Sequence, residues 1–163
     1  SVGCRMIGTV SNEKKADLAL KNGCEFVINY KKENVLERVM EITNNSGVPV
    51  VYDGVGKDTF KISLSCLQTR GLMVSFGQSS GMVDDVNLHK TFNPKSLFYT
   101  RPTLMHYTRN KEELKISSTS LFNKIKEKKL KTNIYKIFDL KDADKAHELL
   151  ESRKSSGSII LKT

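Results

Sequence analysis

The sequence predicts an α/β fold with a doubly wound parallel sheet, and three observations carry this prediction. Residues 50–56 and 71–77 are apolar runs that each end on glycine, with one helix-length segment between them. A strand buried on both faces of a parallel sheet reads as such a continuous run. Strands spaced by single helices pair in parallel through right-handed crossovers. Because cofactors bind at the carboxyl ends of strands in open α/β sheets, the two glycine ends indicate a nucleotide site.

Strands and helices are expected to alternate through residues 5–77. Ser11 can cap the first helix, and the glycine of Asn22-Gly23 suits its end. The second helix is expected at residues 33–44, where apolar residues recur close to one face. The third helix is marked by Phe60, Leu64 and Leu67. The expected strands are residues 5–10, 26–29, 50–56, 71–77 and, further on, 96–100.

The regular alternation is expected to stop after residue 77. Residues 78–94 are polar, glycine-bearing and long for a plain connection, as functional loops often are. Pro102 ends the strand that follows. The elements expected after it are a helix at 108–128, a strand at 134–138, a helix at 141–153 and a strand at 158–162. We therefore expect a partial dinucleotide-binding domain at residues 1–104, incomplete at its amino terminus, and a carboxyl-terminal α+β segment at residues 105–163.

Length and composition indicate a soluble globular protein. A chain of 163 residues with 38% hydrophobic content can bury a real core. No stretch approaches the roughly 20 apolar residues of a membrane span, and residues 1–9 lack the layout of a signal peptide. A cytoplasmic location without membrane association is expected.

The chain carries 27 basic and 18 acidic residues, a formal net charge of +9. Much of the excess lies in residues 124–131, and such a run is typical of a solvated helix face and its exit. The run lacks the interleaved aromatic residues of a base-stacking surface. Nucleic-acid binding is therefore not expected, although a basic RNA-binding module stays an alternative.

The sequence gives no sign of a metal or disulfide site. Its three cysteines, Cys4, Cys24 and Cys66, are too few and too scattered for a disulfide framework, and no C-x-x-C or H-E-x-x-H pattern occurs. The three histidines share no metal-ligand spacing. Asp53 could be mistaken for a catalytic carboxylate, but at the end of a core strand it is expected to accept hydrogen bonds from nearby backbone groups.

The sequence carries only part of the dinucleotide-binding pattern. No G-x-G-x-x-G occurs, and no strand with a glycine-rich turn precedes the strand at residues 5–10, so the chain is either part of a larger protein or not a dinucleotide binder. In such folds an acid after the second strand selects NAD, and a basic residue selects NADP. Here Glu13 is followed by Lys14 and Lys15, and Tyr30 ends the next strand. Alternatively, both lysines are solvated and Glu13 only supports the start of the helix.

Five blocks in this order resemble the quinone oxidoreductase (zeta-crystallin-like) branch of the medium-chain dehydrogenase/reductase superfamily, over essentially the whole chain. They are Ile7-Gly8-Thr9-Val10, Val27-Ile28-Asn29-Tyr30, the run from Val51 to Gly56, the run from Gly71 to Gly81, and Thr100-Arg101-Pro102. The last two blocks argue against another Rossmann-like enzyme, such as a methyltransferase, which is the remaining alternative.

The resemblance implies NADPH-dependent reduction of quinones or related electron-poor enones, without catalytic zinc. It implies that Lys15 and Tyr30 hold the adenosine 2′-phosphate with help from Arg153, and that Val55 lines the adenine-ribose region. The nicotinamide side would consist of Phe76, Gly77, Gln78 and Ser79, above a floor of Pro102, Thr103 and Leu104. No catalytic side chain is named, because the redox chemistry belongs to the cofactor.

Members of the resembled family also carry an amino-terminal GroES-like domain, a first Rossmann strand and a glycine turn, which this sequence lacks. The resemblance therefore implies that the chain is the carboxyl-terminal portion of such a reductase and that residues 105–163 pack on the other domain. On its own the chain is expected to lack activity and to bind NADPH weakly or not at all. A homodimer is expected through the edge strand near Leu97 to Tyr99.

Overall fold

The structure is a computed structural model that describes residues 3–152 and 154–163. These residues form two compact units, one of residues 5–114 and one of residues 115–163 with residues 3 and 4. Among the described residues, no helix is long and apolar enough to cross a bilayer. The expected boundary at residue 105 concerns domain membership in a larger protein and stays a prediction.

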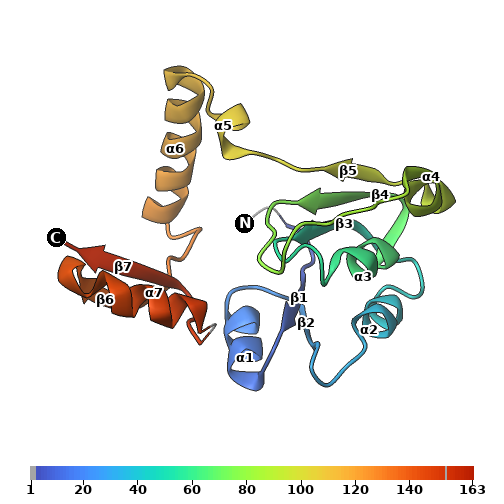
Figure 1. The fold of residues 1–163 in the computed structure, drawn as a ribbon, viewed down its shortest axis with the longest axis horizontal. Helices are drawn as coiled ribbons and strands as arrows, with labels where there is room; N and C mark the ends of the chain where they lie inside the picture. The colour runs from blue at the N-terminus through green and yellow to red at the C-terminus, as the bar shows by residue number, and fades with distance from the viewer. Residues whose placement is uncertain (1–2, 153) are drawn as a thin grey trace. The chain divides into compact units, whose positions relative to one another are not determined.

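The unit of residues 5–114 alternates strands and helices, as expected (Figure 1). Its first six elements are β1 (Ile7–Val10), α1 (Glu13–Lys21), β2 (Phe26–Asn29), α2 (Val35–Ile42), β3 (Val48–Asp53) and α3 (Phe60–Ser65). They are followed by β4 (Leu67–Ser75), α4 (Leu88–Phe92), β5 (Phe98–Thr100) and the single turn α5 (Leu104–Tyr107).

Every strand pair in this unit is parallel, which confirms the predicted α/β class, but the strands form two sheets rather than one. One sheet has the order β1-β2 and the other the order β3-β4-β5. In a doubly wound sheet the first strand lies centrally, two strands follow on one side and three on the other. The two sheets correspond to these flanks, and no strand of the described residues lies between β1 and β3.

A shared core joins the two sheets. Ile28 of β2 and Val39 of α2 are buried together with Cys66, and this cluster packs against Ile7 of β1 and Val51 of β3. A second cluster, made of Phe60, Leu64, Leu67 and Met73, lies between α3 and β4. The split sheet is thus held in one unit by side-chain packing.

One sequence assignment within this core was wrong. Leu67 was expected to continue the third helix, but α3 ends at Ser65 and Leu67 is the fully buried first residue of β4. The reason is a long-range pairing, because Leu67 lies opposite Val48 of β3 before the register shifts. The Lys95 amine completes the junction by donating hydrogen bonds to the carbonyls of Ser65 (2.9 Å) and Leu67 (2.6 Å).

The long segment 78–94 contains a helix that the sequence analysis missed. The short helix α4 starts after Asn87, whose side chain accepts a hydrogen bond from the Lys90 amide at 2.9 Å. Asparagine is a favoured cap at this position, so a signal was present. The helix has only five residues, too few to show a periodic pattern.

In the other unit the helices and strands lie close to the predicted positions. They are α6 (Lys111–Lys126), which begins before the unit boundary, β6 (Ile134–Asp139), α7 (Ala143–Glu151) and β7 (Ser158–Lys162). Strands β6 and β7 pair in parallel, with α7 as the crossover between them. No residue of α6 is buried.

Candidate functional site

The loops after β3 and β4 pack backbone against backbone at two glycines. A Cβ placed on Gly77 would lie 2.5 Å from the Gly54 carbonyl oxygen and 2.9 Å from its Cα. A Cβ on Gly54 would lie 3.0 Å from the ring of Phe76, whose amide donates to the Asp53 carbonyl at 2.9 Å. Gly77 thus has no room for a side chain against the backbone of Gly54, whereas a side chain at Gly54 would meet the ring of Phe76.

Asp53 organises the loop after β3. Its carboxylate accepts hydrogen bonds from the amides of Val55 (2.8 Å) and Gly56 (3.0 Å) and from the hydroxyls of Thr59 (2.7 Å) and Ser63 (2.7 Å). Burial opposes ionisation of this side chain, but the hydrogen bonds from the two hydroxyls and two amides outweigh burial and lower its pKa below the ordinary value. The expected role of Asp53 in binding backbone groups is confirmed.

Ser80 ties the second loop to the first. Its hydroxyl donates to the Val55 carbonyl at 2.8 Å and accepts from the Asp58 amide at 3.0 Å. The Ser80 amide also donates to the Val55 carbonyl, at 2.8 Å, and the Ser79 amide reaches the Gly54 carbonyl at 3.4 Å. Together these bonds hold Val55 and Ser79, two of the residues expected to contact a cofactor, in adjacent loops.

The segment after β5 joins the same edge. Val74 near the end of β4 lies opposite Thr100, so Pro102, Thr103 and Leu104 follow at the edge where the glycine loops begin. The guanidinium of Arg101 donates to the side-chain oxygen of Gln78 at 2.8 Å. The structure therefore brings together the expected nicotinamide-side and floor residues. Sequence reasoning did not find the Arg101 contact, because the two residues lie on different loops.

A second group of residues lies at the ends of β1 and β2, namely Glu13, Lys15, Tyr30 and Lys32. We call it the phosphate corner, after the role that the sequence analysis expected of Lys15 and Tyr30. Val10 lies opposite Asn29, and the Tyr30 amide donates to the Val10 carbonyl at 3.1 Å. Lys15 lies in the first turn of α1, where its amide donates to the side chain of Asn12 at 2.9 Å. Lys15 and Tyr30 thus follow neighbouring strand ends, as the sequence analysis expected, whereas Arg153 lies outside the described residues.

The sequence analysis did not find the partner of Glu13. The amine of Lys32 lies 2.7 Å from a carboxylate oxygen of Glu13. The two residues are separated by a helix and a strand, so no local pattern predicts their pairing. The one available signal was a lysine close behind the strand end at Tyr30.

Within residues 3–152 and 154–163, no group of three or more His, Cys, Asp or Glu side chains could hold a metal ion. The buried Cys66 is a packing residue, because burial raises the pKa of its thiol and keeps it protonated. Among the described residues, neither a metal site nor a reactive thiol is thus found beside the strand-end loops.

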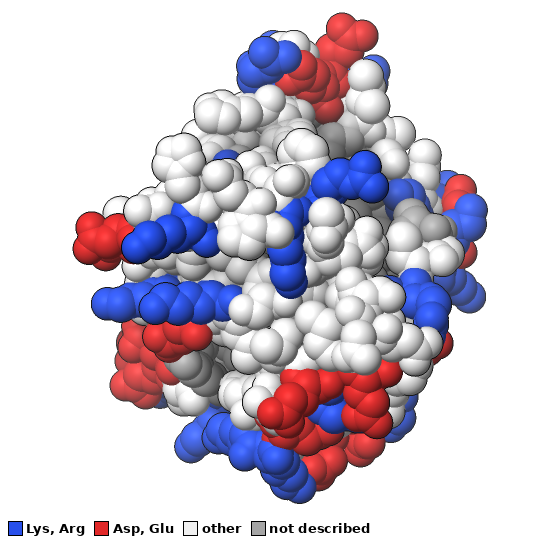
Figure 2. All heavy atoms as spheres, turned by 90° about the vertical axis from the view of Figure 1, so that its right-hand side faces the viewer, with Lys and Arg blue, Asp and Glu red and all other residues white. Residues whose placement is uncertain are grey.

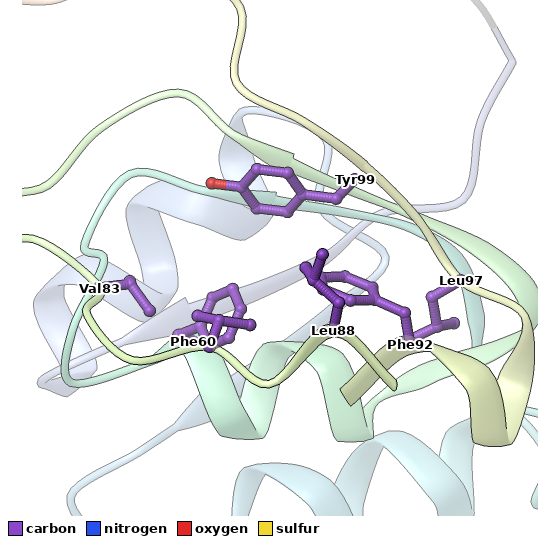
Figure 3. A pocket seen from close by; sticks show the side chains of 7 residues that line it. Phe60, Val83, Leu88, Phe92, Leu97 and Tyr99 are labelled. Atoms are coloured by element: carbon purple, nitrogen blue, oxygen red, sulfur yellow. The ribbon is translucent and has the colours of Figure 1, made fainter. Parts of the chain in front are cut away.

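An apolar cavity of about 310 Å³ lies apart from the expected cofactor residues. Figure 3 shows the side chains around it, with Tyr99 of β5 above Phe60 and Phe92. The Tyr99 ring meets both phenyl rings edge to face, at centroid distances of 6.3 Å and 6.0 Å. The cavity borders the outer strand of the three-stranded sheet. We place the candidate site at the strand ends because the glycine loops and polar groups converge there, whereas the cavity lining is apolar.

A parallel α/β unit whose glycine loops meet at the strand ends has the architecture of a Rossmann-like domain. The comparisons identify it further. The chain belongs to the zinc-binding dehydrogenase family, whose family model matches residues 1–124. This result confirms the family resemblance found in the sequence.

The similar proteins include several quinone oxidoreductases. The chain is 48% identical over 163 residues to quinone oxidoreductase 1 of Escherichia coli, covering 99% of this chain and 50% of that protein. It is 42% identical over 161 residues to a 2-haloacrylate reductase of Burkholderia sp, covering 98% of this chain and 48% of that protein. The chain spans about half the length of these relatives.

Solved structures agree with the predicted fold. The structure of Escherichia coli quinone oxidoreductase complexed with NADPH matches with a TM-score of 0.94 and 49% identity, covering 99% of this chain and 50% of that one. A mycobacterial protein complexed with NADPH matches with a TM-score of 0.93 and 38% identity, over 99% of this chain and 50% of the other.

Proposed function

We propose that this chain forms part of an NADPH-dependent reductase of quinones or related enones that works without catalytic zinc. The observation that carries the proposal is the likeness to a quinone oxidoreductase in complex with NADPH, which extends over 99% of the chain. The convergence of three strand-end loops with a lysine-bearing corner supports it, since a dinucleotide needs both a flat nicotinamide site and a polar adenosine site.

Two features of the strand-end loops support a nicotinamide site, since the Phe76 ring is 60% exposed and the Gln78 side chain is fixed from the neighbouring segment. When bound, NADPH would supply a hydride to the quinone, and a proton from solvent would complete the hydroquinone. The chain's own part is to bind and orient the cofactor. We assign Phe76, Gly77, Gln78 and Ser79 to the nicotinamide side, with Arg101 holding the Gln78 amide in place. Pro102, Thr103 and Leu104 would form the floor beneath it.

At the adenosine end we assign Val55 to the adenine-ribose region and Lys15, Tyr30 and Arg153 to the 2′-phosphate. Tyr30 is 53% exposed, so its ring and hydroxyl are accessible to a ligand. A lysine in the first turn of a helix adds its charge to the positive end of the helix dipole, which favours an anion. The family resemblance supports these roles, and the placement of Lys15 and Tyr30 at neighbouring strand ends supports theirs further.

We further propose that the chain works as the carboxyl-terminal portion of a larger reductase and is inactive alone. Two observations support this. No described strand lies between β1 and β3, and the apolar side chains of Leu121 and Phe122 on α6 remain 49% and 65% exposed. A central strand, a glycine turn and a GroES-like domain, on which residues 105–163 would pack, account for both.

We also propose a homodimer, in a cytoplasmic setting. Strand β5 is an outer strand of its sheet, and its Phe98 is 60% exposed. An unpaired apolar edge favours pairing with its two-fold mate. Light scattering on the complete gene product is expected to give twice the monomer mass, and Phe98→Glu to shift the mass toward the monomer. A monomer for the unsubstituted protein would contradict the dimer.

The test of the activity follows NADPH oxidation by the complete gene product with a benzoquinone substrate. We expect kcat/KM with NADPH to exceed that with NADH by about tenfold or more, and chelators to leave the rate unchanged. Equal or faster turnover with NADH would overturn the cofactor assignment. No NADPH oxidation with any quinone or enone would overturn the activity itself.

A further inference from the structure

An ion pair lies in the phosphate corner, between the first residue of α1 and the turn after β2. The Lys32 amine is 2.7 Å from a carboxylate oxygen of Glu13, and the side-chain amide of Asn29 donates to the same oxygen at 3.4 Å. Lys32 and Asn29 together hold the Glu13 carboxylate at the point where the two strand ends meet.

The position of Glu13 bears on cofactor choice. An acid that follows this strand in a dinucleotide fold binds the ribose hydroxyls of NAD and repels the 2′-phosphate of NADP. Glu13 is the first acidic residue after β1 and opens the next helix, so an uncompensated charge on it would disfavour a phosphate at this corner. A corner that accepts NADPH therefore needs the charge of Glu13 to be neutralised.

The turn that carries Lys32 is well defined. The amides of Lys32 and Glu33 donate to the Asn29 carbonyl at 2.8 Å and 2.9 Å. The Asn29 amide in turn donates to the Glu33 carboxylate at 2.8 Å, and the Lys31 amide donates to the Asn29 side chain at 3.1 Å. The backbone of Lys32 is thus fixed in a closed turn, from which its side chain reaches Glu13.

Both partners are charged at neutral pH. The hydrogen bond and charge of Lys32 lower the pKa of Glu13, with a smaller contribution from Asn29, and Glu13 raises the pKa of Lys32. The charged residues within two positions of the pair in sequence are Lys14, Lys15, Lys31 and Glu33. Glu33 is itself paired with Arg38 at 3.1 Å.

Fold stability does not explain the pair. The side chains of Lys32 and Glu13 are 66% and 70% exposed, and exposed ion pairs contribute little to stability. Helix α1 already has its cap, since the Asn12 side chain accepts from the Lys15 amide. A specific interaction that the fold does not need is a candidate for ligand selection.

We propose that Lys32 determines cofactor specificity by neutralising Glu13, so that the phosphate corner accepts the 2′-phosphate of NADPH. This inference rests on the proposed function. It adds the pair of Glu13 and Lys32, which acts through charge. Lys15 and Tyr30 would bind the 2′-phosphate, and Lys32 would remove the repulsion that Glu13 otherwise exerts on that phosphate.

The experiment measures binding of two cofactor fragments to the complete gene product by titration calorimetry. The fragments are adenosine 2′,5′-bisphosphate and 5′-AMP, which differ only in the 2′-phosphate. We expect Lys32→Ala to weaken the affinity for the bisphosphate by about three- to tenfold and to leave the affinity for AMP unchanged. The reason is that the uncompensated charge of Glu13 would act on the 2′-phosphate alone. Glu13→Gln combined with Lys32→Ala is expected to restore the affinity, and Lys32→Arg to retain it.

Lys31→Ala is the matched control, because it removes the same charge from the same turn. An equal loss of affinity in Lys31→Ala and Lys32→Ala would overturn the inference in favour of general charge attraction. Failure of the double variant to recover would also overturn it, since Lys32 would then act without Glu13. The effect is expected to shrink as salt is raised from low ionic strength. Unchanged melting curves will show that each variant is folded.

The same titrations separate this inference from the proposed function. If the unsubstituted protein shows no preference for the bisphosphate over AMP, the NADPH assignment fails, and the inference fails with it. If that preference is present and Lys32→Ala leaves it intact, only the inference is overturned and the proposed function stands.

Discussion

The two parts of the candidate site are built from different interactions. The loops after β3 and β4 are held by backbone contact and by a buried carboxylate, with Gly77 against Gly54 and Asp53 at the centre of four hydrogen-bond donors. The phosphate corner is held by exposed charges, with Glu13 and Lys32 both more than half accessible to solvent. The loops therefore depend on packing and the corner on charge, so substitutions should damage the loops through stability and the corner through selectivity.

The largest expected effect is the loss of Asp53. Replacing it with alanine leaves the half-buried hydroxyls of Thr59 and Ser63 and two loop amides without their acceptor. We expect the free energy of unfolding to fall by about 2 to 4 kcal/mol, measured by urea denaturation of the complete gene product. Asp58→Ala, at an exposed position in the same loop, is the control and should change it by less than about 0.5 kcal/mol. Similar losses in both variants would contradict the central role of Asp53.

The same carboxylate predicts a pH dependence. The folded-state pKa of Asp53 lies below its unfolded value of about 3.9. Its contribution to stability is therefore complete above the unfolded value and is lost as pH falls through the lower folded value. Denaturation curves between pH 7 and acid should show this decline, and Asp53→Asn should make the decline shallower. An unchanged slope in Asp53→Asn would show that other carboxylates cause the decline.

Gly77→Ala is expected to rank next. The new Cβ would lie 2.5 Å from a backbone oxygen, and backbone cannot move aside as a flexible side chain can. We expect a loss of about 1 to 3 kcal/mol in the free energy of unfolding together with weaker NADPH binding. The control is Gly8→Ala in β1, where the nearest atom is the Cys24 sulfur at 3.0 Å and less adjustment is needed. A larger loss at Gly8 than at Gly77 would argue against tight contact between the two loops.

The smallest expected effect on stability, and a clear one on selectivity, is that of Lys15→Ala. We expect KM for NADPH to rise by about tenfold and KM for NADH to change little, because only the 2′-phosphate loses its counter-charge. The melting temperature should change little, since Lys15 is only half-buried and alanine keeps the amide that donates to Asn12. Lys14→Ala is the matched control on the next residue. An equal rise in KM for both cofactors would show that Lys15 does not bind the 2′-phosphate.

Much of the fold could be predicted because its signals are local. The apolar runs that became β3 and β4, the glycines that follow them and the end of α1 at Asn22 act through neighbours in the chain. The expected cap of α1 was wrong by one residue, because Asn12 and not Ser11 accepts the hydrogen bond from the Lys15 amide. Leu67 was misassigned because its partner Val48 belongs to another strand. Helix α4 was missed because five residues show no periodicity. The other errors thus arose where pairing was long-range or an element was very short.

The same division holds for the site. The expected cofactor residues could be placed on strand ends from the sequence, because parallel strands bring their carboxyl ends to one edge. The contacts that organise the site could not be predicted. Arg101 meets Gln78 across two loops, and Ser80 meets Val55 and Asp58. Such bonds join residues that are far apart in sequence, and no spacing rule relates them.

The sequence alone thus determined the α/β class, the family and the strand ends where a nucleotide could bind, since these depend on local pattern and on motif order. Tertiary structure decided that the Gly54 backbone leaves no room for a side chain at Gly77, that Asp53 is a structural carboxylate, and that Glu13 is paired with Lys32. The physical reason is that steric fit, burial and charge pairing act between atoms close in space, and only the folded chain brings those atoms together.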